Sequence, residues 1–150
     1  MRLRAHGISV DVPPGWEGKI FRRSGGRPAL HVASFALPSD DGEFGSFALR
    51  SLHGRGALVA IPEYTPNFAD RPLFAHRGLP HPISVRQLSP RALQRRRPGL
   101  AGIQRFFTAQ GRAFCLYVVV ASHDRSAVVA ETNRILATVR IDPAPGSSAT

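Results

Sequence analysis

Several residues of the sequence have the side-chain types of catalytic groups, but their spacing matches no catalytic motif. Ser122, His123 and Asp124 are the residue types of a hydrolytic triad, yet they follow one another directly. Catalytic triads are assembled from separate segments, so we interpret this stretch as a turn before a helix, with Asp124 or Ser126 as the N-cap. Cys115 is the only cysteine and lies inside an apolar run, which favours a small buried side chain over a nucleophile. The sequence therefore predicts no catalytic residue.

The spacing of the other ligand-type residues predicts neither a metal nor a cofactor. His76 and His81 lie on one proline-containing segment and could meet a metal ion, but a third ligand is missing. The acidic segment 38–45 lacks the six spaced oxygen ligands and the closing glutamate of a calcium loop. Gly54 and Gly56 form a G-x-G without the third glycine of a dinucleotide-binding fingerprint.

The distribution of charge is the most unusual property of the sequence. The formal net charge is +10, and between Arg71 and His123 there are nine arginines and no aspartate or glutamate. Such a segment is typical of a surface that meets an anionic partner. Five of these arginines are our candidate surface for an anion or a partner: Arg86, Arg91, Arg95, Arg96 and Arg97.

The interpretation of this segment that we prefer from the sequence is an ordinary solvated surface. In that case acidic residues from elsewhere in the chain fold over it and pair with its arginines. The acids expected to do so are Asp40, Asp41, Glu43, Glu63 and Asp70.

The elements that position these residues are organised around the stretch from Ile103 to Ile141. Residues 114–121 are eight consecutive apolar residues, which predict a strand in the interior of a sheet with both faces covered. Residues 105–108 predict its hairpin partner, with Gly111 supplying a positive φ in the turn. A helix is expected at about 125–137, followed by a closing strand at 138–141. That helix covers one face of the sheet, so the other face needs a cover from elsewhere.

The remaining patterns complete the predicted fold. Further strands are expected at 8–12, 19–23, 29–37, 46–51, 57–64 and 83–88. We therefore predict a single α+β domain over residues 1–141, with one antiparallel sheet of about six or seven strands and one main helix packed on it. Residues 142–150 predict a disordered tail. The predicted core residues are Val10, Val12, Trp16, Leu30, Val32, Leu116, Val118, Val120, Val128, Ile135, Leu136 and Val139.

Two short blocks of the sequence resemble a known fold family. The stretch V-D-V-P-P-G-W at 10–16 is similar to the opening of PsbP-like domains, and the turn, long strand, helix and closing strand at 111–141 resemble their ending. The blocks V-P-P-G-W and Q-R-F-F…F-C-L-Y-V-V also resemble those of uncharacterised actinobacterial proteins. PsbP-like domains include photosystem accessory proteins, a Ran-binding import factor, bacterial lipoproteins and secretion chaperones. The resemblance implies an antiparallel sheet flanked by helices and a binding role rather than catalysis. The chain departs from the family in its arginine-rich middle and in lacking a lipobox cysteine.

Three functional hypotheses follow from these patterns. The first is a non-catalytic binding or adaptor domain that engages a protein partner through a sheet face or the proline-rich segment 65–82. The alternative is a basic surface for nucleic acid or another polyanion, with Phe106 or Phe107 stacking on bases. An enzyme of unknown class is the third. The sequence begins without a charged and apolar leader, and its apolar runs are too short for a transmembrane segment, so we expect a cytoplasmic protein.

Overall fold

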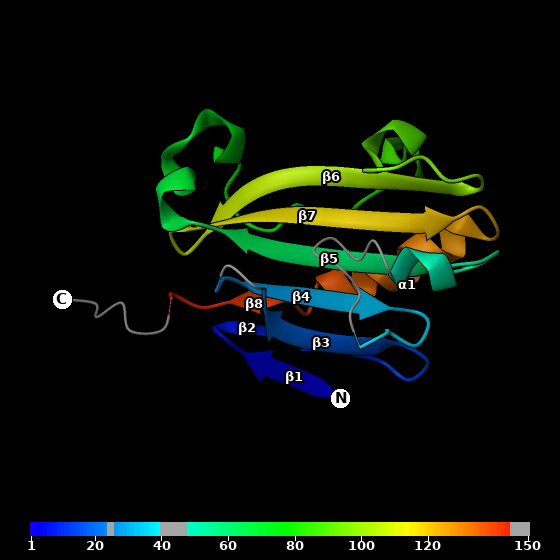
Figure 1. Ribbon diagram of the computed structural model, residues 1–150, viewed down its shortest axis with the longest axis horizontal. Coiled ribbons are helices and arrows are strands. Elements are labelled where there is room, and N and C mark those ends of the chain that lie inside the picture. Colours follow the sequence, from blue (N-terminus) through cyan, green and yellow to red (C-terminus); the bar gives the residue numbers. More distant parts are fainter. Residues whose placement is uncertain (24–25, 40–47, 145–150) are drawn as a thin grey trace.

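The computed structural model describes residues 1–23, 26–39 and 48–144, which form two antiparallel sheets and one α-helix. The larger sheet has five strands, in the spatial order β3-β4-β5-β7-β6 (Figure 1). Their bounds are β3 (Glu17–Arg22), β4 (Pro28–Ala33), β5 (Ala57–Tyr64), β7 (Arg112–Ala121) and β6 (Leu100–Ala109). The smaller sheet has the order β1-β2-β8, with bounds β1 (Arg2–Ala5), β2 (Ile8–Asp11) and β8 (Arg140–Ile141).

Strand β7 lies in the interior of the larger sheet, as its apolar run predicts. All ten of its residues are buried, and it pairs with β5 on one side and β6 on the other. The β6–β7 turn places Gln110 and Gly111 at positive φ values of 54° and 72°. Two successive residues of this kind suit the right-handed twist of a tight hairpin. The predicted strand, its hairpin partner and the contribution of Gly111 to the turn are therefore confirmed.

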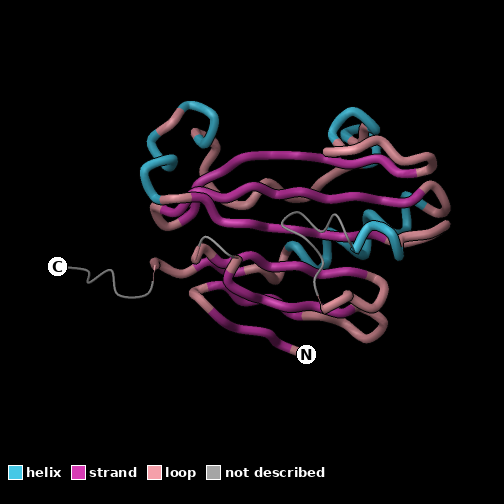
Figure 2. The backbone as a smooth tube through the Cα atoms, viewed as in Figure 1, coloured by secondary structure: helices cyan, strands magenta, loops and turns pink. Residues whose placement is uncertain are grey.

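Both faces of the larger sheet are covered, by different elements (Figure 2). Helix α1 (Arg125–Leu136) and the small sheet pack on one face, where Val128 and Leu136 meet strand residues such as Leu116 in one apolar cluster. The opposite face carries a second cluster, to which Leu49 and Leu93 contribute from outside the sheet. The expected helix at 125–137 is confirmed, as is the α+β class.

In the described part of the chain, five short 3₁₀ helices lie between the strands. They are η1 (Ala48–Ser51), η2 (Pro66–Asp70), η3 (Pro72–Phe74), η4 (Val85–Gln87) and η5 (Pro90–Ala92). Leu49 of η1 and Leu93, directly after η5, provide the cover of the second sheet face. Segment 66–92 thus runs beside β6 without adding a strand of its own.

The prediction of one single sheet is wrong. The described strands divide into two sheets because β2 pairs with β1 and with the closing strand β8, in the register Ile8↔Ile141. Pro13 and Pro14 stop the ladder after β2, and Gly15, at a φ of 85°, turns the chain away before β3 begins. The end of the chain therefore joins the beginning instead of extending the larger sheet.

Two further strand predictions also fail. Residues 83–88 form the 3₁₀ turn η4 because the main chain of Ile83 is bound by the helix: its N–H donates to Asn133 Oδ1, and its carbonyl accepts from Asn133 Nδ2, both at 2.8 Å. The predicted strand 46–51 is the 3₁₀ helix η1 from residue 48 onward, and residues 46 and 47 lie outside the described part. A short run of alternating apolar residues cannot distinguish the period of a strand from that of a helix, so its secondary structure is ambiguous in the sequence.

The predicted core is confirmed with one exception, since Trp16 is half-buried and packs at the margin of the first cluster. The beginning of the predicted tail is anchored, because Asp142 N–H donates to the Gly7 carbonyl at 2.8 Å. Residues 145–150, the rest of that tail, lie outside the described part of the chain.

Candidate anion-binding surface

Most acidic side chains of the described residues are already paired with arginines outside the segment 71–105. Asp11 pairs with Arg2, and Asp142 with Arg4. Asp124 and Glu131 both pair with Arg55. These contacts leave few carboxylates to neutralise the arginine-rich segment.

Of the five acids expected to cover that segment, the structure describes Glu63 and Asp70, and neither pairs with one of the five candidate arginines. Glu63 pairs with a residue of the nine, Arg112, in a buried contact at the other end of the hairpin. Asp70 is exposed and makes no ion pair within the described residues. Asp40, Asp41 and Glu43 lie outside the described part of the chain.

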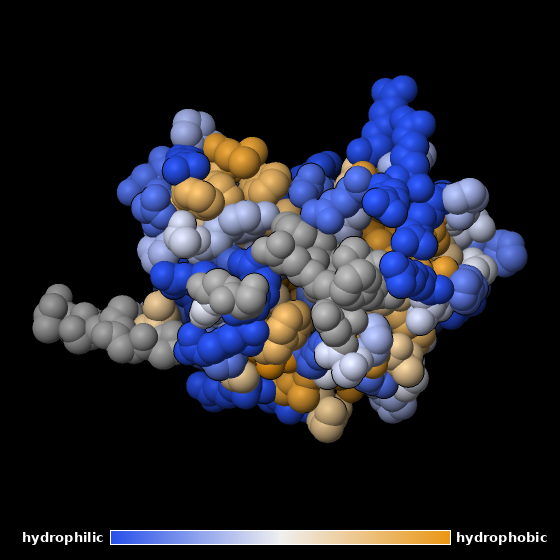
Figure 3. Space-filling model, viewed as in Figure 1, coloured by the Kyte–Doolittle hydropathy of each residue, from blue (hydrophilic) through white to orange (hydrophobic). Residues whose placement is uncertain are grey.

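The five candidate arginines are open to solvent. Arg86, Arg91, Arg95 and Arg96 are exposed, and Arg97 is half-buried. Within the described residues, none of their guanidinium groups makes a hydrogen bond or an ion pair. Figure 3 shows hydrophilic side chains projecting from the molecule above η5 and the start of β6. Five cations that lack an acidic partner among the described residues form a strongly positive surface in so short a segment.

The segment that carries these arginines is attached to the outer edge of β6 at two points. Ser89 and Gly102 exchange two main-chain hydrogen bonds of 2.9 Å near one end. At the other end Thr108 N–H donates to the His76 carbonyl, and its own carbonyl accepts from Gly78 N–H. We call the arginines held along this line the basic edge: Arg77, Arg86, Arg91, Arg95, Arg96, Arg97 and Arg105.

A pocket of about 480 Å³ lies at the end of the basic edge where β6 begins. Arg96 and Arg97 line it together with Arg125, the first residue of α1. Arg125 is held in place because its Nε donates to the Ala121 carbonyl at 3.1 Å and its Nη2 to that of Gly99 at 3.5 Å. The other lining residues are Leu88, Pro90, Pro98, Gly99, Leu100 and Ala101, so no acidic side chain of the described residues lines the pocket.

Of the five candidates, the structure thus brings Arg96 and Arg97 into one pocket. Arg86, Arg91 and Arg95 do not line it. Arg125 was missed by the sequence reasoning because it is 28 positions from Arg97 and belongs to the helix. The pairing Leu100↔Ala121 brings the two segments together, and no local pattern signals that contact.

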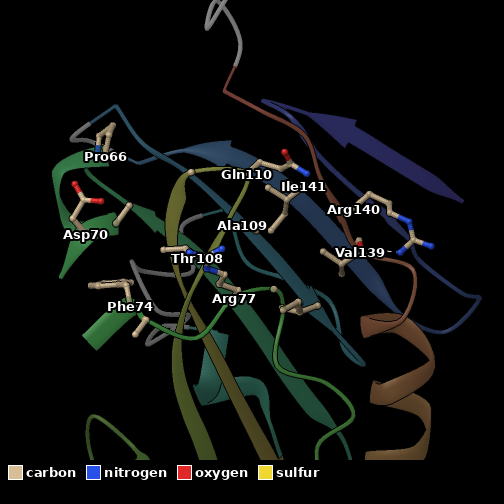
Figure 4. A pocket seen from close by; sticks show the side chains of 15 residues that line it. Pro66, Asp70, Phe74, Arg77, Thr108, Ala109, Gln110, Val139, Arg140 and Ile141 are labelled. Carbon is tan, nitrogen blue, oxygen red and sulfur yellow. Dashed lines mark hydrogen bonds between the residues drawn. The ribbon is translucent and has the colours of Figure 1, made fainter. Parts of the chain in front are cut away.

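A larger pocket of about 900 Å³ lies at the opposite end of β6 (Figure 4). In that view Asp70 and Phe74 stand on one side of the hairpin residue Thr108, and Val139 and Arg140 stand on the other. The guanidinium group of Arg140 donates to the Val139 and Ala137 carbonyls, so it closes the end of the helix. The lining mixes an acid with arginines and apolar groups, and it brings together no pair of groups suited to acid–base chemistry.

Cys115 and Asp124 are of types that can act in catalysis, but both have structural roles here. Cys115 is fully buried, and burial raises the pKa of its thiol to about 12, so it is not a nucleophile near neutral pH. Asp124 precedes the helix but adopts a φ of 60° and makes no capping hydrogen bond; its carboxylate pairs with Arg55 instead. Asp124 is thus the N-cap residue, as predicted, but its side chain does not cap the helix.

The two histidines considered as metal ligands line the same pocket. His76 and His81 both line a pocket of about 240 Å³ beside Arg105. Within residues 1–23, 26–39 and 48–144 there is no group of three or more histidine, cysteine or acidic side chains that could hold a metal ion.

The two phenylalanines considered for base stacking pack against other aromatic side chains of the protein. Phe107 is fully buried and stacks on Phe114 with ring centroids 5.5 Å apart. Phe106 is half-buried and meets Phe74 edge-on at 5.3 Å. Base stacking on Phe107 is therefore excluded in this fold.

Comparison of the chain with protein-family models, with curated proteins and with solved structures finds no match in any of the three. Among the described residues, no helix has the length and apolar character needed to cross a membrane.

Proposed function

We propose that this chain is a non-catalytic binding domain whose basic edge holds an extended polyanion, and that the polyanion is a nucleic acid. One observation carries the proposal: the arginines of the basic edge are exposed or half-exposed and lack acidic partners among the described residues. Arginine is well suited to phosphate because its planar guanidinium group can donate two parallel hydrogen bonds.

The geometry of the basic edge suits a long ligand. Strand β6 has ten residues, which corresponds to about 30 Å of extended chain. Arg77 lies beside its end, Arg105 in its middle and Arg96 beside its beginning. A polyanion that follows this edge meets several cations in succession, and each contact releases counterions from the polymer.

A protein partner at the proline-rich segment 65–82 is the second candidate. An apolar cluster lies on each face of the larger sheet, so we assign the adaptor hypothesis to this segment. Leu73 is 60% exposed there, and the Arg71 guanidinium lies 3.8 Å from the centre of the half-buried Phe68 ring. The resemblance to PsbP-like domains also supports a binding role. An exposed leucine alone is common on protein surfaces, so we place this candidate second.

A salt titration tests the nucleic-acid proposal. Binding of a fluorescein-labelled oligonucleotide of about 20 nucleotides is measured by anisotropy between low salt and about 0.5 M NaCl. We expect log Kd to rise linearly with log [NaCl]. The double variant Arg95→Gln/Arg96→Gln is expected to reduce the slope by about 0.7–0.9 for each arginine removed.

The matched control for this experiment is Arg2→Gln/Arg4→Gln. It removes the same charge from two arginines of β1 that are paired with acids. We expect the control to keep most of the wild-type slope. Equal losses in both double variants would show that net charge, and not the basic edge, causes binding; no binding at low salt would reject the proposal.

A further inference from the structure

The pocket formed by Arg96, Arg97 and Arg125 is an open hollow that places three arginines beside a mostly apolar lining. Its volume of about 480 Å³ lies within the range of small-ligand sites, roughly 300–1,000 Å³. Leu88 and Leu100 line it along with the rings of Pro90 and Pro98. A flat basic surface needs only cations, whereas this pocket can also bury an uncharged part of a ligand.

The three arginines define the charged part of that ligand. They come from two segments, and within the described part of the chain no acidic residue lines the pocket with them. Arg125 is positioned in advance by its bonds to the Ala121 and Gly99 carbonyls, which leave its Nη1 available. Arg96 and Arg97 make no side-chain hydrogen bond within the described residues, so their guanidinium forks are available. A phosphate group matches this set in charge and in hydrogen-bonding geometry.

The apolar lining of the pocket indicates which kind of uncharged group the ligand carries. A nucleobase is a flat group that can pack against proline and leucine side chains while its own phosphate stays at the rim. In a duplex the bases are stacked on one another, so their flat faces cannot pack against the apolar lining. A base can enter the pocket only from an unpaired strand.

We propose that this pocket takes one unpaired nucleotide, with its phosphate on Arg96, Arg97 and Arg125 and its base against the apolar lining. The domain therefore prefers single-stranded over duplex nucleic acid. This inference rests on the proposed function, since it assigns a specific contact within the same basic edge.

The test compares three probes of equal length at one moderate salt concentration: a single strand, its duplex, and an abasic strand that keeps the sugars and phosphates. We expect the single strand to bind about 5- to 10-fold tighter than the abasic strand and the duplex, because one base is buried. Equal binding of all three would overturn the nucleotide pocket while leaving polyanion binding intact. No binding of any probe would overturn the proposed function as well.

Variants locate the preference in the pocket. Arg96→Gln removes a guanidinium that makes no hydrogen bond or ion pair within the described residues, so no polar contact among them is lost. Arg125→Gln tests the helix contribution, with the unfolding temperature measured to detect loosening. Both are expected to reduce the preference for the single strand. Arg134→Gln, on the same helix but outside this pocket, is the matched control and should keep the preference. A loss of preference in Arg134→Gln alone would place the site elsewhere.

Discussion

Replacing Glu63 with glutamine tests what holds the two sheets together. Arg112 of β7 donates from Nε and Nη2 to the two carboxylate oxygens of Glu63, at 3.0 and 2.8 Å. Its Nη2 also donates to the His6 carbonyl, and its Nη1 to that of Asp142. One guanidinium group therefore connects the larger sheet to the turn between β1 and β2 and to the residue after β8.

The expected loss of stability on Glu63→Gln follows from the burial of the ion pair between Arg112 and Glu63. The side chains of Arg112 and Glu63 are 4% and 3% exposed, so water cannot replace a lost carboxylate charge. Removing one partner of a buried ion pair leaves the other uncompensated and costs about 3–5 kcal/mol. For a chain of this length each kcal/mol lowers the unfolding temperature by about 2–4 °C, so Glu63→Gln should lower it by roughly 6–20 °C.

The assay is thermal and urea unfolding followed by circular dichroism, with Glu131→Gln as the matched control. Glu131 is also paired with an arginine, Arg55, but their side chains are 32% and 47% exposed. Exposed pairs contribute about 0–1 kcal/mol, so the control should change stability little. If Glu63→Gln were no more destabilising than Glu131→Gln, the contact between the sheets would depend on apolar packing alone.

Three further predictions concern strand β7. Leu116→Ala removes a fully buried side chain and should lower the free energy of unfolding by about 2–5 kcal/mol, measured by urea denaturation; an unchanged midpoint would contradict its place in the core. With a pKa of about 12, the Cys115 thiol should not react with a thiol reagent at pH 8 until the protein unfolds, and stoichiometric labelling of the native state would refute its burial. Burial raises the pKa of both the Cys115 thiol and the Tyr117 phenol, so the folded state disfavours their charged forms. Stability should therefore be unaffected below pH 9.0 and fall as the pH rises above it, because the unfolded chain loses these protons first. A Cys115→Ala/Tyr117→Phe variant should show a flatter decrease in urea unfolding between pH 9 and 11; the same decrease in both proteins would assign it to other groups.

The hairpin and the helix could be predicted because their signals are local. Eight apolar residues in succession favour an interior strand, and Gly111 permits the turn before it. The spacing of Val128, Ile135 and Leu136 favours a helix with one buried stripe, and all three are buried. These features depend on residues a few positions apart, which is the range over which side-chain periodicity acts.

The failed strand predictions have a different cause. Segment 83–88 has the residue types of a strand, but Asn133 of the helix binds both polar main-chain groups of Ile83. When a side chain provides the hydrogen bonds of the main-chain N–H and carbonyl groups, these groups do not need a neighbouring strand as partner. That contact joins residues 50 positions apart, and the local sequence contains no sign of it.

For the candidate site too, some features could be predicted from nearby residues, and others depend on contacts between distant ones. The residue types alone show that the segment between Arg71 and His123 is rich in arginine and free of acids, because charge is a property of each residue. Which acids pair elsewhere and which arginines meet depends on how the chain folds. Arg125 reaches Arg96 and Arg97 because β6 and β7 pair along their whole length, and β2 joins β8 because the chain turns back after the helix. Pairing between distant strands is set by burial of the shared core, and no short stretch of residues contains that information.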